Sequence, residues 1–395
     1  MTELKTAPRD STGAVQRDSR HAGWLELFFD LVFVALASQL AHTLHGDAGP
    51  ADFAVFFALY FPPWWMWVNL TVAANLFQGD SPRHRVLILA AMLCLAVMAV
   101  AVPQAADGRA PAYALAYAGT RLVLLGLWWP ATRRPAPGVP SVAAWRPLAY
   151  CLAPAAGWAG SAFIPGPWRW GIWALLLAAE VVVVLTVRGG RASRRLHTGH
   201  LVERTGLFVI IVLGEPVIAV VTSAGTRWTA AASWAALLGF VMLAALWWSY
   251  FDFGSAAAER VMGAASAAEA FRLARDVMGF LYFFVTAAVI CVAAGLATVV
   301  EQAGQGRPEA AYWAVVALAG GLALYHTAHA CIALRFGHRA GTVALWALPG
   351  VGVPLAVIAL AGRLAPWQVV LVLAAETVLH LLYAQRRRTP AAAAG

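Results

Sequence analysis

The chain has 395 residues, of which 61% are hydrophobic and 12% are charged, and its mean hydropathy is +0.70. Soluble domains carry about a quarter charged residues, so this composition excludes a mainly water-soluble chain and predicts an integral membrane protein. The formal net charge of +9 would suit nucleic acid. Because the basic residues form short clusters between apolar runs, however, no nucleic-acid partner is expected.

Apolar runs that are long enough for an α-helix to cross about 30 Å of hydrocarbon recur along the whole sequence. They predict an all-α, polytopic membrane bundle of about twelve transmembrane helices. In chain order these helices are expected at residues 22–45, 51–77, 86–104, 111–130, 147–164, 168–187, 203–223, 229–252, 272–300, 311–335, 341–361 and 366–386.

The two ends of the chain, residues 1–21 and 387–395, are polar or low in complexity and are expected to be disordered cytoplasmic tails. The 4 cysteines lie in apolar runs, where a thiol behaves as a small hydrophobe. The sequence therefore predicts no disulfide, no metal site and no cofactor.

Basic residues are shared unevenly between the predicted loops. Of the 28 lysines and arginines, 22 fall in segments on the side of the N-terminus and 5 on the opposite side, while Arg121 falls within a helix. Cytoplasmic loops carry the excess of basic residues in membrane proteins. Both termini are therefore predicted to be cytoplasmic.

Several motifs recur in the two halves of the sequence, which indicates an internal duplication. Residues 64–69 and 247–252 share two tryptophans, a further aromatic residue and a final Asx residue, and residues 177–181 and 373–377 each place a glutamate in mid-helix. Six helices per half would make two parallel repeats, expected at 22–195 and 196–386, with a central cavity between them.

Ionisable residues within the bilayer cost a few kcal/mol or more, so each marks a candidate functional position. Glu26 and Asp30 are four residues apart and share one helical face near the cytoplasmic end. Because two ionised carboxylates repel, this pair favours a shared proton, a metal or an arginine partner. An interfacial helix cap or a structural ion pair is the alternative.

Glu215 lies between Gly214 and Pro216 in the middle of the helix expected at 203–223. Since proline removes a backbone donor, polar backbone and a carboxylate coincide at membrane depth, as they do in binding sites of transporters. A kink that is held by a protonated glutamate is the alternative.

Glu180 and Glu376 are the mid-helix acids of the two halves, and His380 lies one turn after Glu376. They could form a proton pathway or serve as hydrogen-bond anchors, and the sequence leaves both open. Arg121 requires a carboxylate partner, for which Glu180 and Glu215 are the candidates, and a structural salt bridge is the favoured role.

His326 and His329 share a helical face, where neutral imidazoles could relay protons. Their spacing alone is a weak metal signal, because it fixes no third or fourth ligand.

The motif that ends in Asn69 and its counterpart with Trp247, Trp248, Tyr250 and Asp252 have two possible roles. Aromatic pairs near a membrane boundary are usually interfacial anchors, which is the favoured interpretation. Alternatively, their rings stabilise a bound cation, and Asn69 and Asp252 face the common cavity that a true repeat would create.

Residues 26–34, residues 203–208 with 212–215, and residues 247–252 together resemble the bacterial low temperature requirement A family. The resemblance covers every predicted helix and implies a multi-pass protein of the bacterial inner membrane, linked by name to growth in the cold. It implies no settled substrate, cofactor or catalytic residue. Two departures are the weakly acidic stretch at residues 76–80, which argues against a cation site there, and Pro216, where a small polar residue is common.

The favoured function is a proton-coupled secondary carrier whose halves move around a cavity lined by Glu215, Asp252, Asp30, Glu180 and Glu376. Its expected partners are membrane lipids and a small-molecule or lipidic substrate. The sequence contains no phosphate-binding motif of the Gly-rich Lys-Ser/Thr type.

Two alternatives stay open. One is a membrane-embedded enzyme in which a carboxylic acid such as Asp30, Glu215 or Asp252 donates a proton to a lipid or polyprenyl substrate. The other is a structural or regulatory membrane protein whose buried acids hold helices together.

Overall fold

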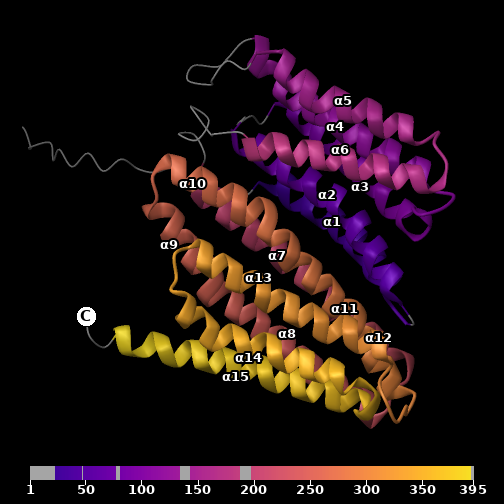
Figure 1. Ribbon diagram of the computed structural model, residues 1–395, viewed down its shortest axis with the longest axis vertical. Coiled ribbons are helices and arrows are strands. Elements are labelled where there is room, and N and C mark those ends of the chain that lie inside the picture. The colour runs from indigo at the N-terminus through magenta and orange to yellow at the C-terminus, as the bar shows by residue number, and fades with distance from the viewer. Residues whose placement is uncertain (1–22, 47, 77–80, 134–142, 187–196, 393–395) are drawn as a thin grey trace, which may run out of the picture.

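The computed structural model describes residues 23–46, 48–76, 81–133, 143–186 and 197–392. Every regular element within these ranges is a helix (Figure 1). Eleven of the helical segments are long and apolar enough to cross a membrane, and the shorter α5, Trp145–Ser161, has 17 residues. The predicted polytopic helix bundle is thus confirmed. The expected tail at residues 1–21 lies outside the described residues.

The first half of the chain forms six helices. They are α1 (Trp24–Thr43), α2 (Pro50–Leu76), α3 (Pro82–Ala101, followed by a 3-10 turn at Val102–Gln104), α4 (Ala110–Arg133), α5 and α6 (Gly166–Thr186). Pro82 begins α3 directly after Ser81, whose side chain accepts a hydrogen bond from the His84 backbone, because an N-terminal helical turn leaves its N–H groups without partners.

The second half forms six longer segments, three of which contain short π-helical stretches. They are α7 (Thr198–Thr226); α8 to α9 (Ala230–Ala264); α10 to α11 (Ala267–Gly304); α12 to α13 (Tyr312–Arg335); α14 (Ala340–Ala359); and α15 (Pro366–Ala392). The turns at Gly306 and Gly337, with φ of 69° and 88°, need the left-handed conformation that glycine adopts without strain.

The largest differences from the predicted boundaries lie at three helix ends and at the C-terminal tail. The helix α7 begins at Thr198 rather than at 203, and the helices expected at 229–252 and 272–300 continue to Ala264 and start at Ala267. The segment predicted as a tail from residue 387 begins within α15, which continues to Ala392. Arginine and alanine are strong helix formers, and the Arg387 guanidinium lies over the Tyr383 ring, 4.9 Å from its centroid.

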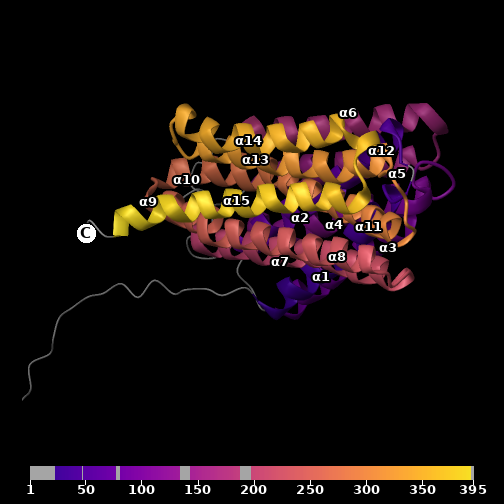
Figure 2. The ribbon, with the colours of Figure 1, turned by 90° about the horizontal axis from the view of Figure 1, so that it is seen from below.

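The helices of the two halves form two groups that lie side by side, with α1–α6 on one side and α7–α15 on the other (Figure 1; Figure 2 gives the view from below). The helices α1 and α2 face α7 and α11 across the contact between them. The segment Ala267–Gly304 is central, since 94% of its most apolar stretch is buried. The contact between the halves is therefore built around α1, α2, α7 and α11.

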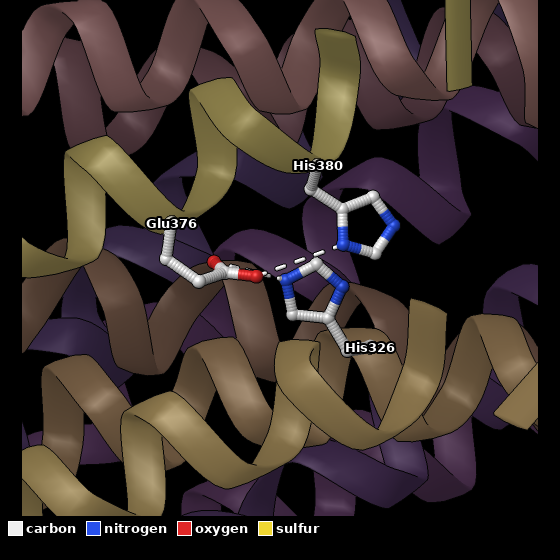
Figure 3. Close-up of side chains that lie close together, drawn as sticks. All are labelled: His326, Glu376 and His380. Atoms are coloured by element: carbon white, nitrogen blue, oxygen red, sulfur yellow. Dashed lines mark ion pairs between the residues drawn. The ribbon is translucent and has the colours of Figure 1, made fainter. Parts of the chain in front are cut away.

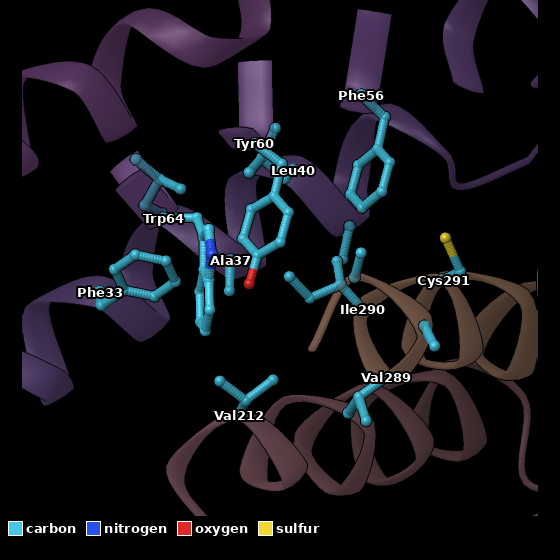
Figure 4. Close-up of a cluster of buried hydrophobic side chains, with 14 of the residues drawn as sticks. Phe33, Ala37, Leu40, Phe56, Tyr60, Trp64, Val212, Val289, Ile290 and Cys291 are labelled. Carbon is cyan, nitrogen blue, oxygen red and sulfur yellow. The ribbon is translucent and has the colours of Figure 1, made fainter. Parts of the chain in front are cut away.

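Most of this contact is apolar and aromatic (Figure 4). Phe33 meets Phe208 with ring centroids 4.8 Å apart, and Tyr60 stacks on Phe283 at 5.3 Å. The Tyr60 hydroxyl donates to Thr286 Oγ1 at 2.6 Å. Aromatic and apolar side chains thus fill the centre of the contact, and the ion pairs of Glu26 and His45 lie at the two ends of α1.

Candidate functional site between the two halves

A cluster of charged side chains joins α1 to α7 where both helices begin. Glu26 and Asp30 lie one turn apart on α1, and His200 and Arg204 lie one turn apart on α7, so each pair shares a helical face. Arg204 Nη1 lies 3.2 Å from Glu26 Oε1, and Arg204 Nη2 lies 3.7 Å from Asp30 Oδ1. His200 Nε2 lies 3.1 Å from Glu26 Oε2. We call these four residues the α1–α7 cluster.

The hydrogen bonds of Asn75, in the last turn of α2, orient the His200 ring. Asn75 Oδ1 accepts from the His197 backbone N–H at 3.1 Å, so its Nδ2 is the donor that points to His200 Nδ1 at 3.2 Å. Because His200 Nδ1 then accepts, a neutral ring carries its proton on Nε2 and donates it to Glu26. Asn75, His200 and Glu26 thus form one directed hydrogen-bond chain.

Asp30 is the most deeply buried acid of the cluster, with 1% of its surface exposed. Trp67 Nε1 donates to Asp30 Oδ1 at 2.7 Å, whereas Asp30 Oδ2 has no hydrogen-bond partner among the described residues. The Arg204 guanidinium also lies over the Trp67 ring, 5.7 Å from its centroid. A buried oxygen with an unused lone pair can accept a proton without disturbing the bonds already made.

A small pocket opens beside the cluster. Glu26 and Arg204 line it together with His84 and with apolar side chains of α1, α2 and α3. The charged pair of Glu26 and Arg204 thus lies at the wall of this pocket, at the contact between the halves.

A family model for the bacterial low temperature requirement A protein matches residues 21–382. The chain belongs to this family. The family motifs at residues 26–34 and 203–208 supply three members of the α1–α7 cluster, Glu26, Asp30 and Arg204, so the fold brings two separate motifs into contact.

A relative from Rhizobium meliloti (strain 1021), named "Uncharacterized protein RA0937", is 30% identical to this chain over 249 residues. The aligned region covers 60% of this chain and 60% of the relative. The chain thus spans about three fifths of the length of the curated relative that it matches.

Glu215, the third acid that the sequence places near the contact, lies on α7 opposite α1. Its carboxyl group is within hydrogen-bonding range of the Ser38 side chain and lies near His42, and 4% of its surface is exposed. The helix α7 continues through Pro216 without a break. Glu215 therefore faces the other half from an intact helix.

The predicted partner of Arg121 is confirmed as Glu180. Their charged atoms lie 3.0 Å apart, with 1% of each side chain exposed. Tyr117 donates to Glu180 at 3.2 Å and Arg121 donates to the Tyr150 carbonyl at 2.7 Å. The Tyr150 hydroxyl donates in turn to Asn69 at 2.8 Å. This network lies within the first half and belongs to α2, α4, α5 and α6.

The aromatic motif at residues 247–252 lies away from these clusters. Trp247 and Trp248 are each 47% exposed, and Trp248 Nε1 donates to the exposed Asp252 carboxylate at 3.0 Å. Tyr250 instead points inward, with its hydroxyl 3.0 Å from that of Tyr282. Asn69 and Asp252 do not share a site. Trp247 and Trp248 face outward, whereas Trp64 and Trp65 of the first-half motif are buried, so the interfacial anchor stays a prediction for Trp247 and Trp248 and is wrong for Trp64 and Trp65.

Glu376 lies within the second half, beside His326 and His380 (Figure 3). His329 lies one turn from His326 on α13, where its Nδ1 is 2.9 Å from the Tyr325 carbonyl. The five acids expected around one cavity are thus distributed over five places: the α1–α7 cluster, the Ser38 side of α1, the interior of the first half, the interior of the second half, and an exposed motif.

His200, Arg204, Asn75 and Trp67 were missed as site residues by sequence reasoning. His200 fell into a predicted loop, and Arg204, at the start of the helix expected at 203–223, was counted with the basic residues of the cytoplasmic side, because the hydropathy of α7 rises only after residue 204. The four-residue spacing of His200 and Arg204, which matches that of Glu26 and Asp30, is the signal that could have placed them on one helical face.

Proposed function

We propose that this chain is a proton-coupled secondary carrier of the bacterial inner membrane, in which α1 and α2 move against α7 and α11. The observation that carries the proposal is the position of ionisable contacts at both ends of α1. Carriers with two bundles expose a site alternately to each side by rocking one bundle against the other.

The two ends of α1 make different contacts with the second half. At its start, Glu26 binds His200 and Arg204. Past its end, His45 Nε2 lies 3.5 Å from Glu301 Oε2 on α11, and the Gly46 N–H donates to Thr298 Oγ1 at 3.1 Å. Between the two ends the contact is mainly apolar and aromatic, and Glu215 lies there near Ser38 and His42. If the two halves separated at one end of α1 and closed at the other, the contacts of Glu26 would break as those of His45 formed, or the reverse.

Proton coupling follows from the chemistry of the α1–α7 cluster. A proton on Glu26 or Asp30 removes a negative charge that faces Arg204, so the attraction between the halves weakens at that end. The Oδ2 atom of Asp30, which has no hydrogen-bond partner among the described residues, would accept the proton. The pocket beside Glu26 would be its path from the cytoplasmic side. Protonation would then favour separation of α1 from α7.

The predicted parallel repeat and cytoplasmic termini are part of this proposal. In each half the fourth and sixth helices share a buried acid with a basic partner, Arg121 with Glu180 and His326 with Glu376. The basic loops place the α1–α7 cluster at the cytoplasmic end. The transported substrate in this proposal is a small molecule or a lipid, as expected from the sequence.

Transport can be tested in proteoliposomes that hold the purified full-length chain. The probe is a small-molecule extract of bacterial cells, offered under an imposed pH gradient, and the vesicle contents are measured by mass spectrometry. We expect at least one compound to accumulate with the wild type and not with Asp30→Asn. Arg109→Ala, which changes an exposed arginine far from the cluster, should behave like the wild type. The absence of any gradient-dependent accumulation would overturn the proposal.

A further inference from the structure

Three metal-ligating side chains meet inside the second half, at a place the carrier proposal does not use. His326 on α13 and Glu376 and His380 on α15 each offer one ligand atom, and these atoms all lie within 4.8 Å of one another (Figure 3). His326 Nε2 is 3.5 Å from Glu376 Oε2, and His380 Nδ1 is 3.6 Å from Glu376 Oε1. From these contacts we infer that the three residues form a binding site for a divalent transition metal, of the class of Zn²⁺.

The separations suit such an ion. Bonds of about 2.0–2.1 Å in tetrahedral geometry place neighbouring zinc ligands roughly 3.3 Å apart. The two nitrogen–oxygen distances, each to a different oxygen of Glu376, are within a few tenths of an ångström of that value. The three ligand atoms, one from each residue, lie within 4.8 Å of one another, so small side-chain movements would bring them to an ion. The imidazole rings stack with centroids 4.6 Å apart. Two imidazoles and one carboxylate are a known zinc ligand set that leaves a fourth position for water.

The His326 Nε2 atom, which has no hydrogen-bond partner among the described residues, also favours a metal ion. His326 is 3% exposed, and its Nε2 is the atom that faces Glu376. A buried nitrogen in this state is costly unless a proton or a cation satisfies it. A metal bound to Nε2 would satisfy it.

Glu376 lacks the arginine partner that two other buried acids have. Asp30 and Glu180 pair with arginines, whereas the ion-pair partners of Glu376 among the described residues are His326 and His380. Because neutral imidazoles carry no charge, a buried carboxylate in this setting needs a positive charge from a proton or a metal. A divalent metal supplies it and joins α13 to α15.

The backbone of α14 makes room for this arrangement. A Cβ atom on Gly350 would lie 2.8 Å from His326 Cγ, so the missing side chain lets the imidazole lie against α14. Trp346 packs its edge on His380, with ring centroids 5.4 Å apart. The two imidazoles are thus held beside Glu376 by packing from a third helix.

Metal binding can be measured on the full-length chain, purified in detergent with a tag that contains no histidine. We expect about one equivalent of Zn²⁺ per chain after dialysis, and a loss of at least about tenfold in Zn²⁺ affinity in each of His326→Ala, His380→Ala and Glu376→Gln. His329→Ala is the matched control, because it removes a neighbouring histidine on the same helix, and it should keep the wild-type affinity. Equal affinity in all four variants would overturn the site.

A measurement on the wild type alone guards against variants that fail to fold. Zn²⁺ should raise its melting temperature in proportion to the logarithm of the free metal concentration, while Mg²⁺, which prefers oxygen ligands, should not. Co²⁺ should give visible absorption bands of a nitrogen-ligated site. A melting temperature that Zn²⁺ leaves unchanged would contradict the inference. The result is independent of transport, so failure of one proposal leaves the other standing.

Discussion

The His200 imidazole donates to the Glu26 carboxylate across 3.1 Å, although the two residues lie 174 positions apart in the sequence. This bond joins the first helix of one half to the first helix of the other. Arg204 strengthens the same contact from one turn further along α7. The two halves are therefore joined at this end by charge and in the middle by aromatic packing.

Removal of Arg204 should destabilise the protein. The variant Arg204→Ala leaves Glu26 and the buried Asp30 without their cationic partner, and breaking a buried pair from one side costs about 3–5 kcal/mol. Thermal unfolding in detergent should show a lower melting temperature. Adding Asp30→Asn should recover part of the loss, because the uncompensated charge is gone. An Arg204→Ala protein with the melting temperature of the wild type would show that the α1–α7 cluster does not stabilise the contact between the halves.

The Arg121–Glu180 pair should behave as a stabilising element of the first half. We expect Arg121→Ala to lower the free energy of unfolding by about 3–5 kcal/mol, because it strands a buried carboxylate. The double variant with Glu180→Ala should be more stable than Arg121→Ala alone. A double-mutant cycle on unfolding free energies measures this coupling, and additive losses would refute it.

More of the fold than of the candidate site could be predicted from the sequence. Hydropathy placed every membrane helix, since a run of about 20 apolar residues is a strong and local signal. Glu26 and Asp30 were identified because acids are conspicuous in such a run. Arg204 was assigned to the cytoplasmic end of its helix, since an arginine at the end of an apolar run looks the same whether it faces lipid headgroups or a buried carboxylate.

Contacts between side chains on helices that are far apart in the sequence could not be predicted. Arg121 had two candidate partners, and only the packing of α4 against α6 decides for Glu180. Likewise, the spacing of His326 and His329 gave no sign that His326 lies beside His380. His380 meets His326 because α15 packs beside α13, which no local pattern encodes.

Gly350 should be intolerant of a side chain. In Gly350→Ala the new Cβ would lie 2.8 Å from the His326 ring, and such overpacking costs about 1–3 kcal/mol. Gly352→Ala is the matched control on the same helix, because nothing lies within 4 Å of its added Cβ. Alanine favours a helix over glycine by about 1 kcal/mol, so the control should be as stable as the wild type or more so. Thermal unfolding of both variants measures the difference, and equal melting temperatures would contradict the packing.

Gly295 should also be intolerant of a side chain, because the backbone of another helix lies against it. A Cβ there would lie 2.3 Å from the backbone nitrogen of Leu318, and backbone cannot turn aside as a flexible side chain can. Small residues of this kind let membrane helices pack tightly. We expect Gly295→Ala to lower the yield of monodisperse protein in size-exclusion chromatography. Gly263→Ala, with open space around the added atom, should elute as the wild type does.

The most direct test of the carrier proposal is the distance between the halves at the α1–α7 end, measured by double electron–electron resonance. Spin labels at Trp24→Cys and Leu334→Cys, both exposed sites, would report on a chain whose four native cysteines are replaced. We predict that the distance lengthens when the pH is lowered, that Glu26→Gln lengthens it at neutral pH, and that Arg109→Ala does not. A distance that stays the same across pH and in Glu26→Gln would contradict the account.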